Sequence, residues 1–343
     1  MSETCCPWCR QPYDYAAETG YKIEHEEVAT GVWRDRCHCL QGHLLPKPNA
    51  ILIGIFGPPG AGKDYLQTTM SRKIAESPLS TFGISVWAPP DERFHSRALI
   101  KPSIPKANEY GTEPKLGIYR IKYRGQESEL WVYDTHGPDF IPGDPLSKFP
   151  FLSQLDVLVF AIPPPCLTWS KNEMSAALRA GPSDDPLQTS HLAHTAISNI
   201  VNALDQWEGG NVPKPRIAVV AMTKCDRYSG LAWRSYTRMC KANSRADVSL
   251  EDLANHCCDA GQFLISHGGQ GYLQSLAEMP GCNGHVFVTA ISSATGEPGL
   301  GEDNSDPELE IAASPDGEPA STLLPLRVAL SLMGIGDYGD NDD

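Results

Sequence analysis

A glycine-rich loop follows an apolar run near residue 50. Residues 51–56 read ILIGIF, and residues 57–63 read GPPGAGK. An apolar strand that enters a loop of the form G-x-x-x-x-G-K is typical of a phosphate site. The two glycines let backbone N–H groups surround phosphate oxygens, and the lysine reaches the terminal phosphates. We therefore predict a nucleotide-binding loop made of Gly57, Pro58, Pro59, Gly60, Ala61, Gly62, Lys63, Asp64 and Tyr65.

The residue after the lysine departs from this pattern. Serine or threonine is expected there, because its hydroxyl is a neutral magnesium ligand, and this chain has Asp64. A carboxylate brings negative charge close to a polyphosphate, so it either ligates Mg²⁺ directly or weakens nucleotide binding. The first alternative predicts slow hydrolysis. The second, which charge repulsion slightly favours, predicts a nucleotide-binding fold that has lost its magnesium.

A second motif ends the apolar segment before residue 135. Residues 131–137 read WVYDTHG, in which Asp134 and Gly137 form D-x-x-G. In this motif the carboxylate holds magnesium through water, and the glycine N–H contacts the terminal phosphate. His136 lies between them and would position an attacking water, or it is an ordinary loop histidine.

A base-recognition motif follows the apolar residues 217–222. Thr223, Lys224 and Asp226 form T-K-x-D, a variant of the N-K-x-D motif that recognises guanine. Asp226 would accept hydrogen bonds from the guanine N1–H and 2-amino groups, and Lys224 would lie along the base and sugar. Adenine lacks that donor pair, so a carboxylate here selects GTP and GDP. Further on, Thr289 and Ala290 resemble the S-A element, whose backbone N–H contacts the guanine oxygen.

Each of these motifs alone is also what a strand ending in a polar turn looks like. Four of them in order, each at the carboxyl end of an expected strand, make coincidence a poor explanation. Over residues 50–291 the chain resembles the P-loop GTPases of the translation-factor-related class. With the cysteine pair that precedes this region, it looks most like bacterial double-GTPase-type proteins encoded in conflict or defence operons. The resemblance implies GTP or GDP as ligand, Mg²⁺ held by Asp64 and Asp134, catalysis by Lys63, Asp134 and His136, and protein partners from the same operon.

Two further positions depart from that family. Pro138 follows Gly137 where many members have the glutamine that orients the attacking water. The threonine of the first switch has no secure equivalent, and Thr112 is the best candidate between the glycine-rich loop and Asp134. We therefore expect GTP hydrolysis to be slow or to need catalytic groups from a partner.

The N-terminal segment carries a second kind of site. Residues 6–9 read CPWC, in which two thiolates three residues apart can bind one tetrahedral zinc ion. The second cysteine pair, at 37 and 39, is one residue closer than in a standard knuckle. Four protein ligands leave no position for water, so we expect a structural or partner-docking role, and free thiols are the alternative. The predicted zinc ligands are Cys6, Cys9, Cys37 and Cys39, with His43 as the alternative fourth ligand and Cys5 as a spare thiol.

Positioning these motifs requires alternating strands and helices. The expected strands cover 51–56, 82–87, 116–124, 129–134, 156–162, 216–223 and 285–289, and the expected helices cover 65–76, 191–207, 250–279 and 323–333. This alternation predicts an α/β fold, a P-loop NTPase G-domain whose mostly parallel central sheet is flanked by helices. We expect a zinc-ribbon-like module over 1–46, the P-loop GTPase-like domain over 47–335 and an acidic tail over 336–343.

Composition excludes some classes of function. The 343 residues include 28 basic and 42 acidic ones, and the net charge of −14 opposes general nucleic-acid binding. No window approaches the ~20 apolar residues of a membrane span, and the N-terminus lacks the pattern of a signal peptide. We expect a cytoplasmic protein with no transmembrane segment.

Together these observations predict a guanine-nucleotide-binding switch protein, a slow or partner-activated GTPase in a multi-protein bacterial system. The main alternative is a pseudo-GTPase scaffold that binds nucleotide weakly or not at all. A P-loop ATPase would use the glycine-rich loop equally well, but it would leave Asp226 without a role.

Overall fold

The computed structural model describes residues 6, 24–29, 32–37, 45–47, 49–63, 66, 67, 70, 85–87, 115–123, 126–135, 150–163, 166–168, 186–208, 213–223, 225, 250–291 and 323–333. Several residues of the predicted sites lie outside these ranges: Cys5, Cys9, Cys39, His43, Asp64, Tyr65, Thr112, His136, Gly137, Pro138, Lys224, Asp226 and the tail 336–343.

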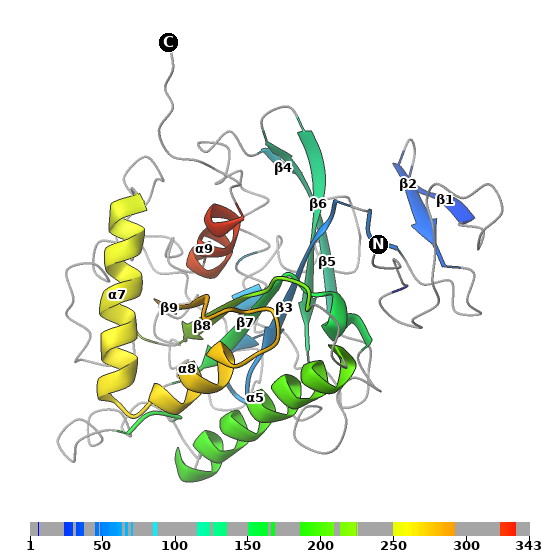
Figure 1. Cartoon of the computed structure of the whole chain (residues 1–343). Helices are drawn as coiled ribbons and strands as arrows, with labels where there is room; N and C mark the ends of the chain where they lie inside the picture. Colours follow the sequence, from blue (N-terminus) through cyan, green and yellow to red (C-terminus); the bar gives the residue numbers. More distant parts are fainter. Residues whose placement is uncertain are drawn as a thin grey trace, which may run out of the picture.

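Seven strands form one central sheet (Figure 1). Neighbouring strands from β6 to β9 pair in parallel, whereas β5 is antiparallel to both β4 and β6, so six strands point one way and β5 points the other. The prediction of an α/β fold with a mostly parallel sheet flanked by helices is confirmed. In spatial order the strands are β4 (Ser85–Trp87), β5 (Lys115–Tyr123), β6 (Gln126–Asp134), β3 (Ile51–Phe56), β7 (Val157–Ile162), β8 (Ile217–Met222) and β9 (Val286–Ala290).

The central strands are buried on both faces. Every residue of β3 and β7 is buried, as is all of β8 except its first residue. Successive side chains of a strand point to opposite faces, so Leu158 and Phe160 pack into one apolar cluster while Val157 and Val159 pack into the other. Strands covered on both faces are continuous apolar runs rather than alternating ones. Those runs are why the sequence predicted these strands correctly.

Helices cover both faces of the sheet (Figure 1). On one face α5 (Pro186–Glu208) and α8 (Gln270–Ala277) supply side chains such as Ile200 and Leu276 to the cluster that contains Phe160. On the other face α9 (Leu324–Leu332) packs over β8 and β9, and α7 (Leu250–Ser266) lies along β9 at the sheet edge. Among the described residues, no helix combines the length and the apolar character that crossing a membrane requires.

A glycine pair divides the helical stretch expected over 250–279 into α7 and α8. Gly268 has a φ of 83°, and a Cβ at this position would lie 2.8 Å from Thr168 Oγ1. The Thr168 N–H donates to His267 O at 2.7 Å, so the end of α7 also docks the segment that follows β7. A short 3-10 helix, η3 (Pro150–Gln154), precedes β7 and was not expected, because its five residues carry no helical periodicity.

Two strands form a separate antiparallel hairpin, β1 (Glu24–Ala29) and β2 (Val32–Arg36), beside the central sheet (Figure 1). These strands were not predicted, because the segment EHEEVA lacks the apolar alternation of a half-buried strand. The Leu45 N–H donates to Asp35 O at 2.8 Å, which ties the chain after the hairpin back to β2. Leu45 is buried, and it lies a few residues before the start of β3.

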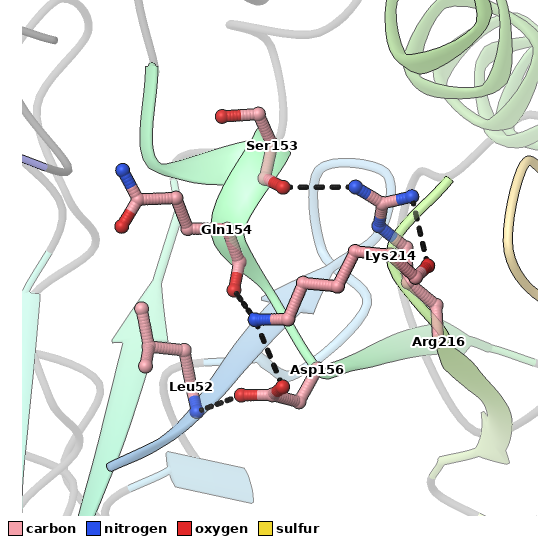
Figure 2. Close-up of polar contacts among 6 residues, drawn as sticks. All are labelled: Leu52, Ser153, Gln154, Asp156, Lys214 and Arg216. Carbon is pink, nitrogen blue, oxygen red and sulfur yellow. Dashed lines mark hydrogen bonds and ion pairs between the residues drawn. The ribbon is translucent and has the colours of Figure 1, made fainter. Parts of the chain in front are cut away.

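A polar network joins the amino ends of the central strands (Figure 2). The Asp156 carboxylate, one residue before β7, accepts the Leu52 N–H of β3 at 2.8 Å and pairs with Lys214 Nζ at 2.9 Å. Lys214 Nζ also donates to Gln154 O of η3. One carboxylate therefore links β3 to the segment that leads into β8.

A buried arginine completes this network. Arg216, 1% exposed, donates from Nη2 to Ser153 O at 2.8 Å and from Nη1 to Pro280 O at 2.9 Å. Its backbone N–H donates to Gly281 O at 2.8 Å. Guanidinium groups suit this position because their five donors can satisfy several carbonyls at once. The network lies at the amino ends of the parallel strands, whereas the glycine-rich loop follows the carboxyl end of β3.

Candidate functional site

The glycine-rich loop lies where the order of the strands reverses. From β3 the chain first builds β4, β5 and β6 on one side, and then crosses to β7, β8 and β9 on the other. In open α/β sheets, the crevice outside the carboxyl ends of the strands at such a switch point is the usual ligand site. Gly57 follows the carboxyl end of β3, between the ends of β6 and β7.

The backbone of the loop depends on glycine at three positions. Gly57 has a φ of 151°, and a Cβ there would lie 2.5 Å from Ala161 O of β7. Gly60 and Gly62 have φ values of 72° and 83°, in the region that other residues rarely adopt. Anion-binding nests are built where residues of left-handed and right-handed conformation alternate and turn their N–H groups toward one point, and positive φ at Gly60 and Gly62 is compatible with that pattern.

Lys63 lies under this loop. Its side chain is only 7% exposed, and Nζ donates to Gly57 O at 3.0 Å and to Pro58 O at 3.1 Å. The cation therefore sits against the loop that would surround a phosphate. Pro58 and Pro59 have no N–H group, so the amide donors of the described part of the loop belong to Gly57 and residues 60–63. Of these, the Ala61 N–H donates to Pro58 O at 3.2 Å.

Helical residues after the loop are anchored to the sheet. The Leu66 N–H donates to Gly62 O at 2.9 Å, a hydrogen bond of the α-helical type. Gln67, 1% exposed, donates from Nε2 to Val132 O of β6 at 3.3 Å. Among the described residues Gln67 Oε1 has no hydrogen-bond partner. The hydrogen bond from Gln67 Nε2 to Val132 O ties these helical residues to β6, the strand that ends at Asp134.

The D-x-x-G strand is held beside the glycine-rich loop. Asp134, the last residue of β6, is paired with Ile55 in the parallel register. The next residue, Thr135, is 1% exposed and donates to Ile55 O through both Oγ1, at 2.8 Å, and its N–H, at 3.4 Å. The predicted magnesium ligand therefore leaves the sheet next to the start of the loop. Sequence reasoning did not assign Thr135 a role, although a hydroxyl directly after a strand is a common anchor.

The segment predicted to recognise the base is bonded directly to the glycine-rich loop. Thr223, 4% exposed, follows β8 and donates from Oγ1 to Ala61 O at 2.6 Å. Its N–H donates to Ile162 O of β7 at 3.2 Å. The residue predicted to begin T-K-x-D thus contacts the loop predicted to hold phosphates, even though 162 positions separate them in the sequence.

The ends of β8 and β9 are joined to each other. The Ile291 N–H donates to Met222 O at 2.8 Å, and the Cys225 N–H donates to Ile291 O at 2.9 Å. Cys225 is buried and lies between Lys224 and Asp226 in the sequence. The recognition segment is therefore supported from the last strand of the sheet.

A buried histidine contacts the Thr289–Ala290 segment. The Ala290 N–H donates to His256 Nε2, on α7, at 3.0 Å. His256 is fully buried, and burial lowers its pKa to about 4, with Asp259 opposing that shift. The Ala290 donor already has an acceptor in the protein, so a guanine oxygen would compete with His256 for it. Thr289 Oγ1 is buried without a hydrogen-bond partner among the described residues.

Sequence reasoning missed His256 because its contact depends on how α7 packs against β9. No local motif marks position 256. A polar residue inside an otherwise apolar helical face is the single hint, and such residues are common in cores.

Two of the predicted zinc ligands are described. Cys6 is fully buried and Cys37 is 6% exposed, and neither forms a disulfide. Within the described part of the chain no group of three or more metal-ligating side chains is present, and Cys9 and Cys39 lie outside that part. Two buried thiols in a short segment with few apolar residues fit the chemistry of a thiolate zinc site. The zinc site stays a prediction.

Comparison of the chain with protein-family models finds no matching family, and comparison with curated proteins finds no match.

Proposed function

We propose that this protein is a guanine-nucleotide-binding switch that hydrolyses GTP slowly, or only when a partner supplies catalytic groups. The observation that carries the proposal is the hydrogen bond from Thr223 Oγ1 to Ala61 O at 2.6 Å. It joins a loop suited to phosphate with the segment suited to guanine. We further propose that the chain is a P-loop GTPase of the translation-factor-related class.

Phosphate binding is supported by the loop itself. Gly60 and Gly62 have positive φ values of the kind that anion-binding nests use, and Lys63 Nζ lies against the same loop at Gly57 O and Pro58 O. Backbone N–H groups and a lysine ammonium are both donors that suit phosphate oxygens.

Guanine selection is supported by the motif T-K-x-D. Asp226 would accept two hydrogen bonds from guanine, and the bonds at Thr223 and Cys225 hold the backbone on both sides of Lys224. An adenine nucleotide would present no matching donor pair to the Asp226 carboxylate.

The catalytic part of the proposal concerns Lys63, Asp134 and His136. Bound Mg²⁺, held by Asp134 and Asp64, would neutralise charge on the terminal phosphates. Lys63 would orient the same phosphates, and His136 would position water. With Asp64 at the hydroxyl position and Pro138 in place of glutamine, the expected rate is low. Residues 91–115 and 134–142 would order around GTP and be released after hydrolysis.

The second candidate is a pseudo-GTPase scaffold, and the charge of Asp64 favours it. A carboxylate next to a polyphosphate adds repulsion unless a cation lies between them. In this candidate the nucleotide binds weakly, or not at all, and the fold serves to assemble partner proteins.

The N-terminal module would carry a structural Zn²⁺ and dock a protein partner. The burial of Cys6 and Cys37 supports this part of the proposal. Zinc content can be measured on the purified chain and on Cys37→Ser, with the exposed Cys258→Ser as matched control. One zinc per chain, lost in Cys37→Ser alone, is expected. No zinc in the wild type contradicts the module.

Nucleotide binding tests the main proposal. Affinities for GTP, GDP and ATP are measured with and without Mg²⁺ on the wild type, on Asp226→Asn and on the control Asp205→Asn, an exposed carboxylate on α5. We expect guanine-specific binding that Asp226→Asn abolishes and Asp205→Asn preserves. Equal affinities for ATP and GTP would favour an ATPase. If none of the three nucleotides binds, the pseudo-GTPase scaffold is the remaining candidate.

Turnover of GTP by the wild type and by Asp64→Thr then separates the two candidates. A hydroxyl at position 64 is expected to strengthen magnesium-dependent binding and to raise the rate. If it changes neither, the assignment of Asp64 to the metal site is wrong.

A further inference from the structure

Three hydrogen bonds connect a helix residue to the recognition segment. His256 Nε2, on α7, accepts the Ala290 N–H at 3.0 Å. Ile291, the residue after Ala290, donates its N–H to Met222 O at 2.8 Å, and its carbonyl oxygen accepts the Cys225 N–H at 2.9 Å. The connection therefore runs from α7 through the end of β9 to Cys225.

His256 is a costly residue for this position if stability is its whole role. Because Nε2 accepts a hydrogen bond, the proton of the neutral imidazole is on Nδ1. Nδ1 is buried and has no hydrogen-bond partner within the part of the chain that the structure describes. An unsatisfied buried donor lowers stability, which an apolar side chain of similar size would avoid. What the imidazole adds is an acceptor for the outward-facing N–H of an edge strand.

We propose that His256 is a positioning residue for guanine recognition. By holding the Ala290 N–H, it fixes the end of β9 and, through Ile291, the backbone at Cys225. In this arrangement the Ala290 N–H is not the donor to the guanine oxygen that the family resemblance implies, and recognition depends on Asp226. Cys225 lies between the two residues predicted to contact the base and sugar, Lys224 and Asp226. This inference rests on the proposed guanine-nucleotide function, and His256 itself touches no nucleotide.

The test compares GDP with inosine diphosphate, which lacks the 2-amino group that Asp226 would recognise. The ratio of the two affinities reports the alignment of Asp226, whereas a general loss of stability lowers both affinities together. The variants are His256→Leu, which removes the acceptor, and His256→Gln, whose Oε1 can accept the same N–H. The matched control is Leu264→Ala, which removes a fully buried side chain from the same helix.

We expect His256→Leu to lower the preference for GDP over inosine diphosphate about 3- to 10-fold, the range for one misaligned hydrogen bond. His256→Gln should keep the preference within about twofold of wild type. Leu264→Ala should lower Tm and leave the preference unchanged. Hydrogen exchange at residues 221–225 should be faster in His256→Leu than in Leu264→Ala.

The outcomes distinguish a failure of this inference from a failure of the proposed function. A wild type that binds GDP, together with a His256→Leu variant of unchanged preference, removes the role of His256 alone. A folded wild type that binds no guanine nucleotide removes both. If His256→Leu does not fold, His256→Asn replaces it, because the shorter asparagine amide does not reach the Ala290 N–H. An unchanged preference for GDP over inosine diphosphate in His256→Asn also overturns the positioning role of His256.

Discussion

Replacing Thr223 with valine should weaken both the fold and nucleotide binding. Valine has nearly the same shape as threonine but no hydroxyl, so the change removes the 2.6 Å hydrogen bond to Ala61 O and little else. Thr223 is 4% exposed and Ala61 is fully buried, which means that water cannot readily replace the lost donor.

The size of the effect follows from this burial. A buried acceptor left without a donor costs about 1–3 kcal/mol of unfolding free energy, and we expect a loss of about 1–2 kcal/mol because one short contact is involved. If about 1 kcal/mol of that bond is needed to keep the glycine-rich loop in place, the affinity for GDP should fall about fivefold.

Chemical denaturation and GDP titration measure the two effects on the same samples. Thr223→Ser keeps the hydroxyl and loses a methyl group, so its GDP affinity should stay within about twofold of wild type. The reasoning is refuted if Thr223→Val loses stability but binds GDP as tightly as Thr223→Ser does. That result would mean that the bond serves the fold and leaves the phosphate loop unaffected.

Three further predictions address other parts of the structure. Gly57→Ala places a Cβ 2.5 Å from Ala161 O, so GDP affinity should fall more than about tenfold. The control Gly284→Ala is also at positive φ but has nothing within 4 Å of its Cβ, so it should leave GDP affinity unchanged. Equal losses of GDP affinity in the two variants would contradict the steric explanation. Arg216→Met leaves Ser153 O and Pro280 O without their donor, so the unfolding free energy should fall by about 2–4 kcal/mol with little change in GDP affinity. Burial lowers the pKa of His256 from 6.5 to about 4, so between these pH values the unfolded chain binds more protons than the folded chain. The contribution of His256 to stability should be complete above pH 6.5, and the unfolding free energy should fall by up to about 3 kcal/mol as pH drops toward 4. Denaturation measured across this pH range should show a smaller slope in His256→Gln.

The strands of the fold were predictable because parallel strands covered on both faces need continuous apolar residues. The runs at 51–56 and 157–162 therefore identify β3 and β7 without ambiguity. In the sequence, the residues of the predicted motifs follow apolar runs of this kind. Because the carboxyl ends of parallel strands meet at one edge of the sheet, these residues are brought to the same edge. Thr223 and the glycine-rich loop could be predicted to be neighbours for this reason.

Contacts that depend on side-chain packing between distant elements could not be predicted. The bond between His256 and Ala290 requires the orientation of α7 relative to β9, and the bond between Gln67 and Val132 requires the rotation of the helix after the loop. Neither residue belongs to a local motif. Hairpin β1–β2 was missed for a different reason, since its polar strands lack the alternation that identifies a half-buried strand.

In the proposed function, nucleotide binding and magnesium use are separable. Phosphate binding would depend on the backbone at Gly60 and Gly62 and on the cation of Lys63, none of which involves a metal. Asp64 would affect the metal and the charge at the terminal phosphate. Since that repulsion grows with the charge of the phosphate chain, GDP should lose less affinity than GTP when Mg²⁺ is removed. A protein that binds GDP without Mg²⁺ but binds GTP only when Mg²⁺ is present would be a switch controlled by magnesium, even if its GTP hydrolysis is slow.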